Sequence, residues 1–259
     1  MTPASAPQAA RGGLLLLEGK KAVITGGSRG LGQALCARFA AEGADVAFNY
    51  SSDEEGARKT LSLIEGQGRR GLAFKVSVLD EEGLAKLALD VERAWGGVDV
   101  LVNNAGITQP LPLALMEGAD WDRVMDVNVK GAFLAVRAVA RGMIRRKNGV
   151  ILNLGSLAGE RAIESPVHYS ASKAAVRGFT EALSKEFSRY GIRVNCLAPG
   201  LLDDGVATNL PPHRLKEYLK HCSLGRVGTV AEVAKFAAFL VSDRNSYMNG
   251  ETILMDGGL

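Results

Sequence analysis

The sequence predicts an α/β protein with a doubly wound parallel sheet of about seven strands and helices on both faces. Short apolar segments alternate with longer segments whose apolar residues recur every third or fourth position, the pattern of strands alternating with helices. The apolar segments are almost uninterrupted, as expected of strands covered on both faces. A glycine-rich segment joins the first predicted strand to the first predicted helix, a common feature of such sheets.

The predicted elements follow one another without an internal linker. The strands are residues 21–25, 45–50, 71–78, 98–103, 150–154, 192–197 and 252–255. The helices are residues 31–42, 54–65, 81–95, 121–146, 167–189 and 230–241. Several helices end where a glycine can adopt the left-handed conformation that closes a helix, namely at Gly43, Gly66, Gly96 and Gly191.

We expect one domain, residues 18–259, behind a flexible N-terminal tail, residues 1–17. The tail is rich in Ala, Pro and Gly, and its apolar run 14–17 is too short for a signal peptide or a membrane span. Residues 201–223 break the strand–helix alternation with Pro211, Pro212 and a short helical stretch. This segment is a candidate lid over a substrate site.

Composition excludes several functional classes. The chain of 259 residues is 47% hydrophobic and 23% charged, which is ordinary for a soluble globular protein. A formal charge of +3 is too small to indicate nucleic-acid binding. The three cysteines show no CxxC spacing and none of the density of a disulfide scaffold. We therefore expect a cytoplasmic protein without a metal site, and without a nucleic-acid or membrane partner.

The glycine-rich segment has the spacing GxxxGxG, with Gly26, Gly30 and Gly32. Residues without side chains allow a tight turn and a close approach of the backbone to a pyrophosphate, whose charge the N–H groups at the helix start can bind. A lone glycine triad is weak evidence. Its place between the first strand and the first helix makes it a strong prediction of a Rossmann-type dinucleotide site.

The choice of dinucleotide depends on the end of the second strand. Enzymes that use NAD usually carry an acidic residue there, which binds the ribose 2′-hydroxyl. Here the strand ends in Asn49, Tyr50 and Ser51, and the first carboxylate is Asp53. Arg29, in the glycine loop, can pair with a 2′-phosphate, although a solvated loop arginine is the plain alternative. The sequence therefore predicts NADP(H).

A candidate catalytic group follows the fifth strand. That strand leads into Ser156, and Tyr169 and Lys173 follow with the spacing YxxxK. A spacing of four puts both side chains on one helix face, about 6 Å apart along the axis. An ammonium beside a phenol favours the phenolate, so Tyr169 can exchange a proton with a carbonyl oxygen while Ser156 hydrogen-bonds that oxygen. Chance pairs of this spacing are common, so the prediction depends on the position after the strand.

These motifs resemble the short-chain dehydrogenase/reductase family over nearly all of residues 20–258. The matching pieces are Thr25-Gly26-x-x-x-Gly30-x-Gly32, Asn103-Asn104-Ala105-Gly106, Asn128, Ser156, Tyr169-x-x-x-Lys173 and Pro199-Gly200. The resemblance implies a catalytic tetrad of Asn128, Ser156, Tyr169 and Lys173. It also implies that the Asn128 backbone holds a water of a proton relay, and that Lys173 binds the nicotinamide ribose.

The predicted cofactor-binding residues combine the loop, the second strand and the family positions. They are Gly26, Ser28, Arg29, Gly30, Leu31, Gly32, Asn49, Tyr50, Ser51, Ser77, Val78, Asn103, Ala105, Gly106, Tyr169, Lys173, Pro199 and Gly200. The backbone of Ile107 is expected to lie beside them. Three features depart from the family pattern: Ser77, followed by Val78, stands where an aspartate near the adenine is common, Asp204 stands where a threonine is expected, and the lid carries Pro211-Pro212 and His213.

Within the family the chain looks most like 3-oxoacyl-[acyl-carrier-protein] reductases. The resemblance implies NADPH-dependent reduction of a carrier-bound 3-oxoacyl thioester in fatty-acid or polyketide-like synthesis. It also implies a homotetramer, and carrier-protein docking on Arg141 and Lys185 near the basic run Arg145, Arg146 and Lys147. A solvated charged face explains those basic residues equally well. The alternative functions are oxidation or reduction of a free small ketone, alcohol or sugar, and a non-catalytic dinucleotide-binding subunit.

Overall fold

The computed structural model describes residues 15–204 and 212–259, and it confirms the predicted fold class. A seven-stranded sheet has the order β3-β2-β1-β4-β5-β6-β7, with every neighbouring pair parallel. The strands are β1 (Lys21–Ile24), β2 (Asp45–Tyr50), β3 (Gly71–Lys75), β4 (Val100–Asn103), β5 (Gly149–Leu154), β6 (Ile192–Pro199) and β7 (Thr252–Met255). The strand order reverses direction at β1 and β4, where doubly wound sheets bind their ligands.

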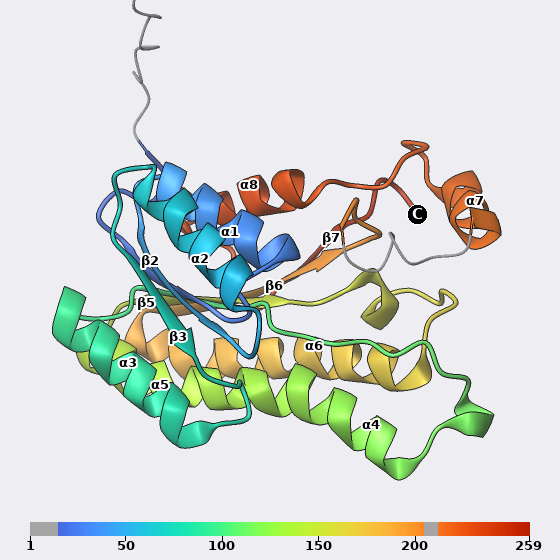
Figure 1. The fold of residues 1–259 in the computed structure, drawn as a ribbon, viewed down its shortest axis with the longest axis horizontal. Helices are drawn as coiled ribbons and strands as arrows, with labels where there is room; N and C mark the ends of the chain where they lie inside the picture. The colour runs from blue at the N-terminus through green and yellow to red at the C-terminus, as the bar shows by residue number, and fades with distance from the viewer. Residues whose placement is uncertain (1–14, 205–211) are drawn as a thin grey trace, which may run out of the picture.

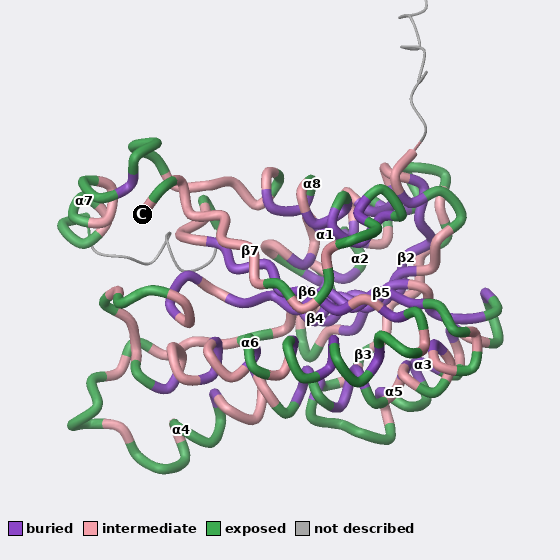
Figure 2. The backbone as a smooth tube through the Cα atoms, turned by 180° about the vertical axis from the view of Figure 1, so that it is seen from behind, coloured by how far each residue is buried: buried purple, intermediate pink, exposed green. Residues whose placement is uncertain are grey.

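Helices cover both faces of the sheet (Figure 1). They are α1 (Gly30–Ala41), α2 (Glu54–Glu65), α3 (Glu81–Trp95), α4 (Gly118–Met125), α5 (Gly131–Arg146), α6 (Val167–Phe187), α7 (Pro212–His221) and α8 (Val230–Val241). One apolar cluster joins α1, α2 and α8 to the sheet, and a second joins α3, α5 and α6 to the opposite face. Figure 2 shows the buried chain concentrated along the central strands.

The long helix predicted over residues 121–146 contains an irregular turn. The chain runs from α4 through the π-helical turn η2 (Asp126–Lys130) into α5. A π-turn adds one residue to a helix and is frequent at functional sites, and periodicity alone does not reveal it. Helix α2 ends at Glu65 as predicted, but the left-handed conformation expected of Gly66 is wrong. Gly66 keeps a right-handed conformation with φ −61°, and Gly68, two residues later, is left-handed with φ +71°.

Leu17, which the sequence analysis placed at the end of the flexible tail, belongs to the folded domain. Leu17 is fully buried in the cluster under α1 and α8, and its N–H donates to the carbonyl of Glu42. Burial of an apolar side chain of this size contributes about 2 kcal/mol to the free energy of folding, which explains why Leu17 is part of the domain. Residues 1–14 of the expected tail and residues 205–211 of the expected lid lie outside the described residues. The short helix predicted after the paired prolines is α7.

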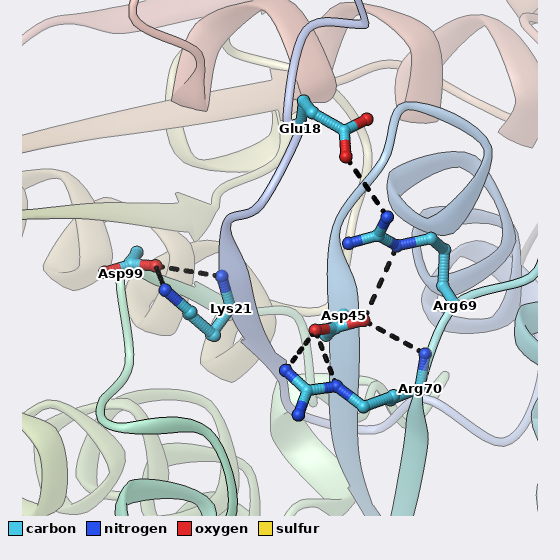
Figure 3. Close-up of polar contacts among 6 residues, drawn as sticks. All are labelled: Glu18, Lys21, Asp45, Arg69, Arg70 and Asp99. Atoms are coloured by element: carbon cyan, nitrogen blue, oxygen red, sulfur yellow. Dashed lines mark hydrogen bonds and ion pairs between the residues drawn. The ribbon is translucent and has the colours of Figure 1, made fainter.

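An ionic cluster joins the N-terminal ends of the first strands, at the edge of the sheet opposite the glycine loop (Figure 3). Asp45, buried at the start of β2, accepts hydrogen bonds from the Arg70 side chain at 2.5 and 2.9 Å and from the Arg70 N–H at 3.0 Å. Arg69 bridges Asp45 and Glu18. Burial opposes the charge of Asp45, but the bonds and charge of Arg70 outweigh it and lower the carboxyl pKa.

The three cysteines of the chain lie in the interior of the protein. Cys36, Cys196 and Cys222 are buried and free, as expected of small core residues. Burial raises the pKa of the Cys196 thiol to about 11, so this group stays protonated and unreactive at neutral pH. Within residues 15–204 and 212–259, no helix combines the length and apolar character needed to cross a membrane.

Candidate active site

The glycine loop between β1 and α1 is packed too closely for side chains. A Cβ on Gly32 would lie 2.0 Å from the Gly26 carbonyl oxygen and 2.7 Å from the Asn104 side-chain nitrogen. Gly26 and Gly30 have φ of +70° and +56°, a conformation that favours glycine. The loop thus leaves its backbone open at the start of α1, where N–H groups can bind a pyrophosphate. These residues fit the predicted dinucleotide.

Side chains from the neighbouring strands hold the loop in place. The Asn104 amide donates to the carbonyls of Thr25 and Gly26 at 2.9 and 3.2 Å. The Thr25 hydroxyl accepts the N–H groups of Asn104 and Ala105, both at 3.0 Å. Buried Asn49 accepts the Gly26 N–H at 3.3 Å and donates to the Val76 carbonyl at 2.7 Å. The Asn49 amide, predicted beside the cofactor, therefore supports the loop from within the sheet.

The end of β2 lies beside the start of α1. Arg29 precedes α1 and is exposed, as is Ser51 beyond β2, whereas Tyr50 is half-buried. Asp53 caps α2 by accepting the Gly56 N–H at 2.9 Å. The first carboxylate after β2 is thereby committed to a helix start, while an arginine stands at the loop.

Tyr169 and Lys173 lie on one face of α6, as predicted. Lys173 is buried, and its ammonium donates to the Leu154 carbonyl at the end of β5, at 2.8 Å. The Lys173 nitrogen lies 5.7 Å from the centre of the Tyr169 ring. A Cβ on Gly106 would lie 3.6 Å from that nitrogen and 3.3 Å from Asn128 Oδ1, so this glycine keeps space open between the two residues. The ammonium is therefore held beside the phenol, away from bulk water.

Asn128 lies in the π-turn η2, and both the oxygen and the nitrogen of its amide make hydrogen bonds. Its oxygen accepts the Ile107 N–H at 2.8 Å, and its nitrogen donates to the Ile107 carbonyl and the Ser172 hydroxyl, both at 2.9 Å. The side chain thus joins the segment after β4 to α6 between Tyr169 and Lys173. Because both backbone groups of Ile107 bond to Asn128, the Ile107 N–H is engaged within the protein.

Ser156 follows β5 and begins the short helical turn η3 (Leu157–Gly159). Its hydroxyl accepts the Ala158 N–H at 3.2 Å, which fixes the turn. Beneath it, buried Asn103 on β4 donates to Asn153 on β5, and Asn153 donates to Thr180 on α6, each at 2.8 Å. This polar chain ties the two central strands to the helix that carries Tyr169.

The other predicted cofactor positions surround the same edge. Ser77 accepts the Leu79 N–H at 3.2 Å, and Val78 is buried against Gly131 at the start of α5. Gly200 packs under the Tyr218 hydroxyl of α7, which accepts the Leu201 N–H at 3.1 Å. The Asp204 carboxylate is placed 3.7 Å from the position of a Cβ on Gly30. The chain beyond β6 therefore approaches the glycine loop.

The predicted docking residues Arg141 and Lys185 are exposed on α5 and α6. Their basic neighbours differ in exposure and partners. Arg145 pairs with Glu92, and Arg146 donates to the Val98 carbonyl at 2.5 Å, so both contact α3 or the segment after it. Glu92 thus offsets the charge of Arg145 on this face, whereas Arg146 keeps its charge.

Sequence reasoning missed several residues that support the site. Asn153 stands in an otherwise apolar strand opposite Asn103 in register, and this isolated polar residue was a usable signal. The parts played by His168 and Ser172 depend on hydrogen bonds across the first turn of α6 and to Asn128. No spacing in the sequence indicates those bonds.

Comparison with known proteins adds names to this geometry. A family model described as enoyl-(acyl carrier protein) reductase matches residues 26–259. The 3-oxoacyl-[acyl-carrier-protein] reductase of Chlamydia trachomatis serovar D is 38% identical over 244 residues, which cover 94% of this chain and 98% of that protein. The enzyme of the same name from Staphylococcus aureus is 35% identical over 240 residues, which cover 93% of this chain and 98% of that one.

Solved structures agree with the fold. The 3-oxoacyl-[acyl-carrier protein] reductase of Brucella melitensis superposes with a TM-score of 0.89 at 31% identity, covering 100% of this chain and 97% of that one. A 7α-hydroxysteroid dehydrogenase, solved with NADH and 7-oxo glycochenodeoxycholic acid, superposes with a TM-score of 0.90 at 32% identity. That match covers 95% of this chain and 96% of the other.

Proposed function

The chain belongs to the short-chain dehydrogenase/reductase family and is a nicotinamide-dependent oxidoreductase, and from this premise we propose that it reduces carrier-bound 3-oxoacyl thioesters with NADPH. The observation that carries the chemistry is the buried Lys173 ammonium beside Tyr169, at the sheet edge that holds the glycine loop. The names of the relatives favour the thioester as substrate. The product is the 3-hydroxyacyl thioester.

Each residue of the proposed tetrad has a separate task. When bound, the dinucleotide supplies the hydride that reduces the substrate carbonyl carbon. The Tyr169 hydroxyl donates the proton that the carbonyl oxygen then requires, and the Lys173 charge favours the phenolate that remains. Ser156 hydrogen-bonds the substrate oxygen before and after the transfer. Asn128 holds the segment after β4 against α6, and its backbone carries the water through which Lys173 recovers a proton.

The proposed cofactor site extends along the C-terminal edge of the sheet. Gly26, Gly30 and Gly32 give the pyrophosphate access to the loop and to the start of α1. Lys173 is assigned to the nicotinamide ribose. The positions proposed to line the remainder are Ser28, Leu31, Tyr50, Ser51, Ser77, Val78, Asn103, Ala105, Gly106, Pro199 and Gly200.

Arg29 is the residue that we propose to select NADP(H). Replacing Arg29 by Ala should raise the KM for NADPH roughly ten- to a hundred-fold, because a charge-assisted bond to the 2′-phosphate is lost. The KM for NADH, which has no such phosphate, should change little and serves as the internal control. Steady-state kinetics with both cofactors measure the effect. An equal change for NADH would show that Arg29 acts on the loop and not on the phosphate.

Arg141 and Lys185 are proposed to receive the acidic carrier protein. The double substitution Arg141→Glu and Lys185→Glu should raise the KM for a carrier-bound thioester roughly tenfold and weaken its salt dependence, since exposed charges mainly steer association. Turnover of a short thioester without carrier should stay the same. If both substrates respond equally, the face has no docking role.

The competing enzyme function is reduction of a free ketone, which the similarity to a hydroxysteroid dehydrogenase keeps in view. NADPH consumption should therefore be compared between acetoacetyl thioesters and a panel of free ketones. We expect the thioesters to react with the higher kcat/KM. Rapid turnover of a free ketone with no reaction of thioesters would contradict the proposed substrate. A non-catalytic role is disfavoured because Ser156, Tyr169 and Lys173 are all present.

We also propose a homotetramer, by analogy with the family, assembled through α4–α5, α6 and the edge strand β7. Strand β7 pairs only with β6 in the described sheet, so one of its edges is available to another chain. Light scattering measures the assembly directly. The proposed setting is the cytoplasm.

A further inference from the structure

His168, the residue before Tyr169, is fully buried in the first turn of α6. Its Nδ1 accepts the backbone N–H of Tyr169 at 2.8 Å. The first N–H groups of a helix have no partner within the helix, and side chains usually cap them from the residue before. Here that residue is Pro166, which offers no side-chain acceptor. The imidazole therefore supplies the bond that a conventional cap would make.

This contact defines the chemical state of the ring. A nitrogen that accepts a hydrogen bond carries no proton, so neutral His168 must carry its proton on Nε2. Nε2 is buried and has no hydrogen-bond partner among the described residues. Buried polar atoms are rarely left in this state. Within the described residues, Nε2 thus has no hydrogen-bond partner, while Nδ1 accepts the Tyr169 N–H.

The carbonyl of Tyr169 is held as well. It accepts the Ser172 hydroxyl at 2.7 Å, and the same hydroxyl accepts the Asn128 amide at 2.9 Å. Both backbone groups of Tyr169 are therefore tied by side chains, one to His168 and the other through Ser172 to the π-turn. The direction in which the phenol leaves the backbone depends on these two anchors.

We propose that His168 is a positioning residue for Tyr169, acting as a neutral imidazole protonated on Nε2 whose Nδ1 fixes the helix start from which the phenol projects. The inference rests on the proposed role of Tyr169 as proton donor. Misplacing a reacting group by about 1 Å can cost up to about a hundredfold in rate. The role concerns the chemical step and leaves dinucleotide binding untouched.

Two substitutions of His168 distinguish the effect of its hydrogen-bond acceptor from the effect of its ring volume. His168→Phe keeps a planar ring and removes the acceptor, and should lower kcat roughly tenfold or more with unchanged affinity for NADPH. His168→Asn offers a short side-chain oxygen to the same N–H and should recover most of the lost kcat. If His168→Phe keeps its kcat, or if His168→Asn is no better than His168→Phe, the proposal is wrong.

Ser184→Ala is the matched control, because Ser184 is another buried polar residue of α6 and bonds to the Glu181 carbonyl several turns from Tyr169. It should lower Tm without lowering kcat. A comparable loss of kcat in Ser184→Ala would show that general loosening of α6 explains the effect. Tyr169→Phe distinguishes failure of this proposal from failure of the proposed function. If Tyr169→Phe retains turnover, Tyr169 is not the proton donor. If Tyr169→Phe is inactive and His168→Phe is active, only the positioning role of His168 is contradicted.

The wild-type protein gives a test that needs no substitution. Nitrogen-15 NMR of the histidine side chains should show His168 with protonated Nε2 and unprotonated Nδ1. Assignment of that signal requires only a spectrum of His168→Asn, from which it disappears. A proton on Nδ1 would overturn the proposal, because such a ring cannot accept the Tyr169 N–H.

Discussion

Replacing Tyr169 by Phe should lower kcat by about 10²–10⁴-fold, the usual contribution of a positioned general acid. The substitution removes only the hydroxyl, and the bonds that hold Tyr169 in the described fold use its backbone N–H and carbonyl. Lys173 keeps its bond to the Leu154 carbonyl. We therefore expect unchanged Tm and unchanged NADPH binding, measured by thermal unfolding and by fluorescence titration.

The pattern of losses identifies the cause. A drop in kcat with normal NADPH affinity shows that the hydroxyl acts in the chemical step. Tyr190→Phe is a suitable control, because it removes a phenol from the turn after α6, at the far end from Tyr169. It should remain fully active. Wild-type turnover by Tyr169→Phe would require another proton donor.

Replacing Gly32 by Ala should abolish dinucleotide binding and destabilise the fold by about 3 kcal/mol or more. The added methyl would lie 2.0 Å from a backbone oxygen and 2.7 Å from the Asn104 amide, so the loop itself must move. Overpacking typically costs about 1–3 kcal/mol, and here the obstacle is backbone, which yields less readily than a side chain. Urea unfolding and NADPH titration measure the two effects.

Gly178 provides the matched control within a helix. A Cβ at this position meets nothing within 4 Å, and the residue is exposed in the interior of α6. Within one protomer, Gly178→Ala should therefore stabilise the helix by about 0.5–1 kcal/mol, the ordinary advantage of alanine in a helix. If Gly32→Ala were equally well tolerated, the close packing of the loop would have no functional meaning.

The exact bounds of several elements could be predicted, because residues next to them in the sequence determine where they begin and end. Helix α2 starts at the Asp53 cap, and α8 starts at a capping box of Thr229 and Glu232. Strands β2 and β7 also have the predicted bounds. Gly66 shows the limit of this reasoning, since a nearby glycine, Gly68, takes the left-handed turn instead.

The candidate site divides in the same way. The chemical groups were predictable, because the glycine spacing, Ser156, and the Tyr169–Lys173 pair have fixed relations to strands and helices. Most of their supports were not, because they arise between elements distant in sequence, and only Asn153, an isolated polar residue in an apolar strand, offered a signal. The Asn103–Asn153 bond depends on the pairing of β4 with β5, and the Asn49 contact with Gly26 depends on the packing of β2 beneath the loop.

The π-turn η2 makes the position of Asn128 sensitive to the length of the chain, as well as to the side chain whose amide joins Ile107 to Ser172. The turn holds a surplus residue compared with a regular helix, and α4 and α5 continue on either side of it. Deleting one residue there would let the two helices fuse into an uninterrupted rod, a locally better helix. The deletion would also rotate the residues before it by about a third of a turn around the helix axis. The contact between Ile107 and Asn128 would then move away from α6. A sounder helix would thus yield a poorer catalyst.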